Sequence, residues 1–114
     1  MTFESYVPRR GDVVWITLNP QAGHEQAERR PTVVLSPRTY NDRVGLAILC
    51  PVTNRAKGYP FEVAIPEGFP ITGAILADQV KNLDWRARNA ELMCTLPSET
   101  IQEILRKLHT LLSD

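Results

Sequence analysis

The segment of the chain richest in reactive side chains is residues 23–31, GHEQAERRP, which lies between the apolar runs DVVWITL and TVVLS. It contains one imidazole, two carboxylates, one carboxamide and two guanidinium groups, whereas a loop between strands needs only turn-forming residues. Cleavage of RNA without a metal requires such a set. A base takes the 2′-hydroxyl proton, an acid protonates the leaving 5′-oxygen, and fixed positive charge stabilises the pentacoordinate phosphorane. The segment is therefore a candidate for half of such a site.

Within this segment, His24, Glu25 and Arg30 can supply the three roles, and Gln26 and Arg29 can act as hydrogen-bond donors. Arginine is a poor proton-transfer group because its pKa lies above about 12, but it binds phosphate well through paired N–H groups. The same residue types are also compatible with a salt bridge between Glu25 and Arg30 that only braces the loop. The residue types alone leave both interpretations open.

A second candidate group begins at Thr53, which follows the apolar run LAILCPV. Its hydroxyl can donate to a phosphate oxygen, or it can form only a local turn. Arg55 and Lys57 follow at once and extend a candidate path for phosphate groups.

The third candidate group is DQVK, with Asp78, Gln79 and Lys81, followed by Trp85 and Arg86. An indole beside guanidinium groups suits base stacking and backbone contact in single-stranded RNA. A tryptophan in the core with arginines on the surface is the alternative for the last two residues.

The charge pattern allows a basic face on a neutral protein. The 114 residues have a formal net charge of zero. Residues 29–88 hold nine Lys or Arg and five Asp or Glu, and are therefore +4, while the two ends together are −4. The neutral total excludes non-specific capture of a polyanion by overall charge. Charges that simply coat a solvated surface would produce the same asymmetry.

Two cysteines far apart in sequence, Cys50 and Cys94, are expected to be buried free thiols. Because no His/Cys cluster has metal-ligand spacing, we expect no metal site and no cofactor. No apolar leader or membrane-length segment is present, so we expect a cytoplasmic protein that does not contact a membrane.

Hydrophobic patterns predict a mainly β protein, formed by one domain over residues 1–114. The loop after the first strand is expected to run from residue 19 to Pro31, and a short helical turn is expected over 37–43. A C-terminal amphipathic helix should begin at Pro97 or Ser98, with His109 on its surface. This order predicts a small antiparallel β-barrel or curled sheet. The expected strands cover residues 13–18, 33–36, 46–52, 61–65, 73–83 and 91–95.

Four segments together resemble the MazF/PemK family of toxin endoribonucleases, the mRNA interferases of toxin–antitoxin systems. They are GDVVWITLNPQAGHEQAERRPTVVLS, YN, CPVTNRAKGYPFEV and LADQVKNLDWRAR. The similarity runs from about Tyr6 to the C-terminal helix, and KGYPFEV with ADQVKNLDWRAR is most similar to the MazF branch.

This resemblance implies an SH3-like barrel of the MazF, Kid and CcdB type with a C-terminal helix, assembled as a homodimer. It implies metal-independent cleavage of single-stranded RNA, such as mRNA, at a short sequence, leaving a 2′,3′-cyclic phosphate and a 5′-hydroxyl. The partner would be a MazE-like antitoxin whose acidic, disordered tail competes with RNA, and DNA would be contacted only through the toxin–antitoxin complex.

The family's active-site arginine falls on Arg30 and its threonine on Thr53, while the EQ pair falls on Glu25 and Gln26. PemK-type members resemble the chain at His24 and Asp78, which serve there in proton transfer or RNA contact. The expected RNA contacts are Gln26, Arg29, Arg55, Lys57, Gln79, Lys81, Trp85 and Arg86.

The chain departs from relatives at two positions. PemK-type members use a basic residue where this chain has Leu76, so the arginine–threonine form of the mechanism is favoured. Relatives often carry Gly where this chain has Glu28, which bears on the flexibility of the loop and on base preference.

Two other functions are compatible with the same barrel. A CcdB-like toxin that binds gyrase would not need Arg30 and Thr53 and would be marked by an aromatic C-terminal end, whereas this chain ends in LLSD. A catalytically silent nucleic-acid-binding module is the other alternative, and the joint presence of Glu25, Arg30 and Thr53 argues against it.

Overall fold

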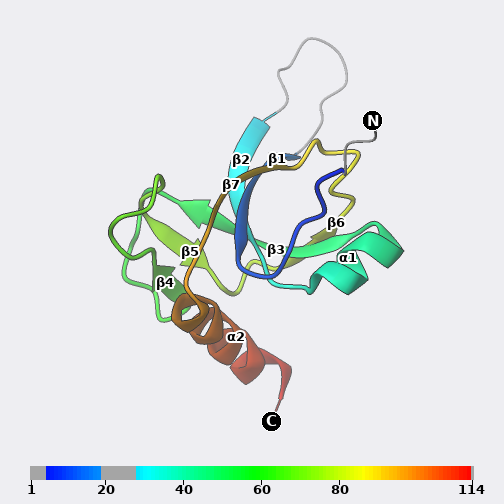
Figure 1. Ribbon diagram of the computed structural model, residues 1–114. Coiled ribbons are helices and arrows are strands. Elements are labelled where there is room, and N and C mark those ends of the chain that lie inside the picture. Colours follow the sequence, from blue (N-terminus) through cyan, green and yellow to red (C-terminus); the bar gives the residue numbers. More distant parts are fainter. Residues whose placement is uncertain (1–4, 19–27, 114) are drawn as a thin grey trace.

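The computed structural model describes residues 5–18 and 28–113. Within these ranges, antiparallel strands form one curled sheet, with the two helices on different sides of it (Figure 1). The strands are β1 (Asp12–Leu18), β2 (Glu28–Val34), β3 (Ala47–Thr53), β4 (Glu62–Ala64), β5 (Ala74–Leu76), β6 (Lys81–Leu83) and β7 (Glu91–Thr95), and the helices are α1 (Arg38–Val44) and α2 (Ser98–Leu112).

The strand order is β4-β5-β3-β2-β1-β7, and β6 also pairs with β3. The apolar strand β3 therefore has three strand partners, which confirms its predicted central place. The described pairing does not join β4 to β7, so the sheet curls without closing. A mainly β fold with a C-terminal helix is confirmed.

Both faces of the central strands are buried, because alternate residues of a strand point to opposite sides of the sheet. Val13, Val33 and Cys50 are cross-strand neighbours and share one apolar cluster with Ile101 and Ile104 of α2. The alternate residues, Val14, Val34 and Leu49, belong to a second cluster that contains Trp85. This double burial explains why β1 and β3 read as continuous apolar runs.

Helix α2 begins after Pro97, as predicted, and buries the Ile101–Ile104 side of its apolar stripe. Its last leucines stay outside the core, with Leu111 51% and Leu112 74% exposed. His109 is exposed, as expected. No helix in the described part of the chain is long and apolar enough to cross a membrane.

Hydrogen bonds of the buried residue Asn41 hold α1 against neighbouring segments of the chain. Asn41 of α1 is fully buried, and its side chain donates to the carbonyls of Pro8 (2.8 Å) and Ser36 (3.1 Å). The Trp85 indole N–H donates to the Asn41 carbonyl at 2.9 Å. Since a buried polar group is costly unless it is hydrogen-bonded, Asn41 fixes α1 and the segment around Trp85 in one arrangement.

The cysteines differ in environment. Cys50 is fully buried, and burial raises the pKa of its thiol to about 12. Cys94 is only half-buried, and the smaller desolvation there also raises its pKa. The expected burial is therefore confirmed for Cys50 and reached only in part by Cys94; both thiols are free.

Strand β2 begins earlier than the sequence indicates. The expected loop was to end at Pro31, but the strand starts at Glu28 and pairs Arg30 with Ile16 and Pro31 with Trp15. Pairing with β3 begins only at Thr32, so the outer part of β2 has a partner on one side alone. Proline is accepted at such an open edge because no ladder bond is required there.

The single strand expected over residues 73–83 is wrong. The chain forms β5 and β6, which both pair with β3. Six residue steps, from Ile75 to Lys81, lie opposite only three steps of β3, from Val52 to Leu49. The three extra residues bulge out as a turn that carries Asp78 and Gln79, so the strand alternation expected for DQVK does not apply.

Candidate functional site

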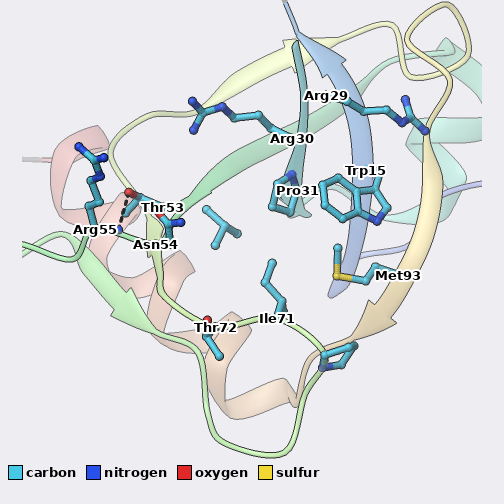
Figure 2. Close-up of a pocket in the computed structure, with 12 residues that line it drawn as sticks. Trp15, Arg29, Arg30, Pro31, Thr53, Asn54, Arg55, Ile71, Thr72 and Met93 are labelled. Carbon is cyan, nitrogen blue, oxygen red and sulfur yellow. Dashed lines mark hydrogen bonds between the residues drawn. The ribbon is translucent and has the colours of Figure 1, made fainter.

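Three adjoining hollows meet at Thr53. The first has a volume of about 790 Å³ and is lined by Arg30, Thr53 and Arg55, together with an apolar side that includes Trp15 and Met93 (Figure 2). The second, of about 220 Å³, is also lined by Arg30 and Thr53. The third, of about 200 Å³, lies where Thr53 and Arg55 meet the turn after β5. Thr53 is thus at the centre of one composite groove.

The register of β2 and β3 explains why Arg30 and Thr53 share two hollows. Thr32 pairs with Pro51 in the antiparallel ladder. Arg30 is two residues before Thr32 and Thr53 is two after Pro51, so the same register continued would set them opposite each other on one face. The ladder between β2 and β3 stops at Thr32 and Pro51, and beyond it the ends of both strands border the hollows.

The Thr53 hydroxyl is held in a local turn and is still able to donate. Its Oγ1 accepts the backbone N–H of Arg55 at 3.1 Å, drawn as a dashed line in Figure 2. A hydroxyl oxygen that accepts one bond keeps its own O–H for another acceptor. The two sequence interpretations of Thr53, a turn former and a phosphate ligand, are therefore compatible.

Gly73 allows the chain to pass close to Thr53. Its φ is +117°, and a Cβ added at this position would lie 2.1 Å from the Thr53 carbonyl oxygen. Only glycine fits such a contact and such a backbone angle. Sequence reasoning did not single out Gly73, because close backbone approach leaves no pattern in one sequence.

Arg30 is paired with Glu28, and the sequence analysis missed this contact. The Arg30 Nε and Nη2 atoms lie 2.6 and 2.5 Å from Glu28 Oε1, and both side chains are about half exposed. The two residues are two apart on one strand and therefore share a face. The pair was missed because this part of the chain was taken for a loop, in which that spacing has no meaning.

Arg29 has a different environment. Nη1 donates to Thr17 Oγ1 at 3.0 Å, and Nη2 donates to the Asn89 carbonyl and to Glu91 Oε1, both at 2.6 Å. Arg29 borders the first hollow, but its guanidinium joins β1 to the chain around residues 89–91. We therefore do not retain the predicted RNA contact for Arg29.

The other predicted contacts lie beside Thr53. Gln79 and Lys81 line the second hollow, and Arg55, Lys57, Asp78 and Gln79 line the third. Among described residues, the first two hollows are bordered by cationic and neutral side chains and by no carboxylate. Such a lining favours an anionic ligand.

Trp85 and Arg86 do not fit the base-stacking role predicted for them. Trp85 is 4% exposed, and its indole N–H is bonded inside the protein. The Arg86 guanidinium lies 4.5 Å from the centroid of that ring and 3.6 Å from Asp42. Neither residue borders the three hollows. The alternative of a core tryptophan with a surface arginine is the one observed.

Three predicted site residues, His24, Glu25 and Gln26, lie outside the described residues. Within the described ranges, no group of three or more His, Cys, Asp or Glu side chains is placed to hold a metal ion.

A family model described as the PemK-like, MazF-like toxin of type II toxin–antitoxin systems matches residues 9–112. The chain belongs to this family. The resemblance found in the sequence is thereby confirmed, and nearly the whole chain takes part in it.

Named relatives agree with the family assignment. The endoribonuclease toxin MazF of Escherichia coli K12 is 46% identical over 107 residues, covering 94% of this chain and 96% of the relative. Endoribonuclease PemK of Escherichia coli is 32% identical, with 91% and 81% covered. A MazE–MazF crystal structure (Form-II) from Deinococcus radiodurans has a TM-score of 0.90 at 51% identity, covering 95% of this chain and 97% of that one.

Proposed function

We propose that this protein is the toxin of a type II toxin–antitoxin system and acts as an endoribonuclease on single-stranded RNA. Cleavage takes place at a short sequence, without a metal, and inhibits translation and growth. The observation that carries the proposal is the convergence of Arg30 and Thr53 on the same two hollows, which have no carboxylate among their described lining residues. Residues 1–114 act as one toxin domain.

The reaction is an internal transfer at phosphorus. The 2′-oxygen attacks the phosphorus as its proton leaves to a base, and the bond from phosphorus to the 5′-oxygen breaks as that oxygen gains a proton. The products are a 2′,3′-cyclic phosphate and a 5′-hydroxyl. Arg30 stabilises the charge that develops on the phosphorane, and Thr53 donates to a non-bridging oxygen. Glu25 serves as base or orients Arg30, with His24 and Asp78 as auxiliary proton-transfer groups.

The cationic residues beside the cleavage point bind the rest of the strand. Among described residues, the side-chain nitrogens of Arg55 and Lys81 have no ion-pair or hydrogen-bond partner. They can therefore contact phosphate without first losing a protein contact. Gln79 and Gln26 contact bases or backbone. A cutter of short sites needs a cationic groove rather than a cationic protein, which agrees with the zero net charge.

A MazE-like antitoxin is the proposed partner, and a homodimer is the proposed active form. A MazE–MazF structure at 51% identity supports the choice of antitoxin. An acidic disordered segment of that partner would occupy the cationic groove and exclude RNA. DNA is contacted only through the toxin–antitoxin complex, and the proposed site of action is the cytoplasm, where mRNA is translated.

The test is cleavage of a long single-stranded RNA in EDTA by wild type, Arg30→Ala and Thr53→Ala, with 5′ ends mapped by primer extension. Arg106→Ala and Thr110→Ala are matched controls, because both residues are exposed on α2 and border none of the hollows. We expect wild type and both controls to cut at one recurrent short motif. Arg30→Ala should cut about 10²-fold to 10³-fold more slowly, and Thr53→Ala should also lose most activity.

Other outcomes would identify another function. Intact RNA with every variant, while the wild type still arrests growth, would contradict the nuclease and favour a CcdB-like toxin that binds gyrase. Intact RNA without growth arrest would favour a catalytically silent nucleic-acid-binding module. Equal cutting by all five proteins would show that Arg30 and Thr53 are not the site.

A further inference from the structure

Tyr59 is an exposed aromatic residue at the edge of the third hollow. Its side chain is 59% exposed, in contrast to the buried Trp85. The hollow that it borders also contains Thr53, Arg55 and Lys57, together with the carboxylates of Glu62 and Asp78. An aromatic face that water reaches, next to cations and close to a candidate cleavage residue, has the composition of a platform for a single-stranded base.

The loop that carries Tyr59 is held by one carboxylate. Glu62 accepts the backbone N–H of Lys57 at 3.0 Å and that of Gly58 at 2.9 Å. The Glu62 backbone N–H donates to the Tyr59 carbonyl at 3.0 Å. Hydrogen bonds to a charged acceptor are roughly twice as strong as those between neutral groups. The side chain of Glu62 therefore holds the two residues before Tyr59, and its backbone N–H holds the carbonyl of Tyr59 itself.

Two further features limit where the Tyr59 ring can point. Gly58 has φ +78°, a backbone conformation that L side chains rarely adopt, and Pro60 restricts the backbone of Tyr59, the residue before it, to extended conformations. The Glu62 carbonyl also accepts the Lys107 ammonium of α2 at 2.8 Å, so β4 is tied to the helix. A platform fixed before the ligand arrives loses less entropy on binding than a mobile one.

Resting on the function proposed above, we propose that the third hollow is a nucleobase subsite next to the cleavage point. The exposed ring of Tyr59 stacks on one unpaired base of the RNA, Gln79 contacts the edge of that base, and Glu62 is a positioning residue for the ring. Asp78 and Gln79 reach the hollow because the three extra residues between β5 and β6 bulge out.

The first test compares Tyr59→Phe, Tyr59→Leu and Tyr59→Ala on an RNA that contains the cleavage motif of the wild type. Phenylalanine keeps the aromatic face, whereas leucine keeps only apolar bulk. We expect Tyr59→Phe to stay within about two-fold of wild type, and the other two to raise KM roughly 10-fold to 100-fold with a smaller change in kcat, as expected for loss of one base stack. The base preference should relax at one position of the motif only. Thermal unfolding midpoints close to that of wild type show that each variant is folded.

The role of Glu62 is tested by a double-mutant cycle. Glu62→Gln removes the charge and should raise KM, but this effect should largely disappear when Tyr59 is already alanine, because Glu62 acts through the ring. Glu67→Gln is the matched control, since Glu67 is an exposed acid that borders none of the hollows. Equal effects of Glu62→Gln in both backgrounds would overturn the positioning role.

The outcome for Tyr59 is separable from that for the nuclease itself. Wild-type cleavage with an unchanged KM and motif in Tyr59→Ala would overturn the subsite and leave the nuclease intact. Loss with leucine but not with phenylalanine would support stacking. Equal loss with phenylalanine and leucine would assign the effect to the hydroxyl and overturn stacking. No wild-type cleavage in EDTA would overturn the proposed function and the subsite with it.

Discussion

Arg29 and Arg30 are neighbours on β2, but their guanidinium groups have opposite surroundings. Arg29 donates to a threonine hydroxyl, to backbone carbonyls and to Glu91, all within the protein. Arg30 contacts one carboxylate, that of Glu28, and borders two of the hollows. Successive residues of a strand face opposite sides, which explains why the two guanidinium groups have different partners.

The difference shows that an arginine can either hold parts of the protein together or leave donors available to bind a ligand. A guanidinium has five N–H donors in a planar fork, and Arg29 uses them to hold the chain around Asn89, which has a positive φ of 54°. Arg30 leaves its Nη1 atom without a partner among the described residues. Only donors without protein partners can bind a transferring phosphate without first breaking a structural contact.

Replacing Arg30 by alanine should slow cleavage and leave stability nearly unchanged, whereas replacing Arg29 should do the reverse. The effect at Arg30 is the larger. Arg30→Ala should lower kcat about 10²-fold to 10³-fold, while the unfolding midpoint changes little because its pair with Glu28 is half exposed. Arg30→Lys keeps a charge but not the fork, so it should restore only part of the rate. Single-turnover cleavage and thermal unfolding measure both quantities. A folded Arg30→Ala protein with the rate of wild type would remove Arg30 from the site.

Arg29→Ala should act mainly on stability. It removes the hydrogen bond to Thr17 and those to the exposed Asn89 carbonyl and Glu91, a loss of about 0.5–1.5 kcal/mol because water can solvate the exposed groups. We expect a midpoint lower by several degrees, with cleavage per folded molecule within a few-fold of wild type. Denaturant unfolding beside cleavage at low temperature separates the two effects. A variant with unchanged stability and a large loss of rate would return Arg29 to the RNA-binding set.

Hydrophobic pattern predicted most of the elements but could not separate the two arginines. The apolar runs of β1 and β3 and the leucine stripe of α2 are local signals, and their strands and helix formed close to the expected bounds. Residues 28–31 carry no apolar alternation, and their strand depends on pairing with β1, a contact far away in sequence. The same limit applies to the bulge that divides β5 from β6, which only the register against β3 reveals.

The sequence likewise pointed to some residues of the candidate site and missed others. Arg30 and Thr53 came from residue types and family resemblance, and the register of β2 and β3 gives the reason why they border the same two hollows. The partners Glu28 and Gly73 could not be found from sequence, because each depends on which residues face each other or pass close together. Trp85 was wrongly predicted to contact RNA, because a tryptophan close to arginines in the sequence can lie either in a core or on a surface.

Glu28 is the ion-pair partner of Arg30, and replacing it should change cleavage less than replacing Arg30 itself. Its carboxylate occupies the Nε and Nη2 atoms of Arg30 and places a negative charge where an RNA phosphate would bind. Glu28→Gln should therefore raise kcat/KM a few-fold at low salt, and the gain should shrink at high salt as screening increases. Glu67→Gln again serves as the control for the change in net charge. A lower kcat in Glu28→Gln would instead show that the carboxylate positions Arg30 for catalysis.

The smallest effect is expected at Glu91, the acidic partner of Arg29. Its side chain is 72% exposed, and exposed ion pairs contribute about 0.2–1 kcal/mol. Glu91→Gln should lower stability by no more than that and leave cleavage unchanged, because Arg29 keeps its bonds to Thr17 and to the Asn89 carbonyl. Unfolding in urea at low and high salt measures the difference, which should vanish at high salt. If Glu91→Gln destabilised the protein as much as Arg29→Ala, the brace would depend on the ion pair rather than on the backbone carbonyls that Arg29 contacts.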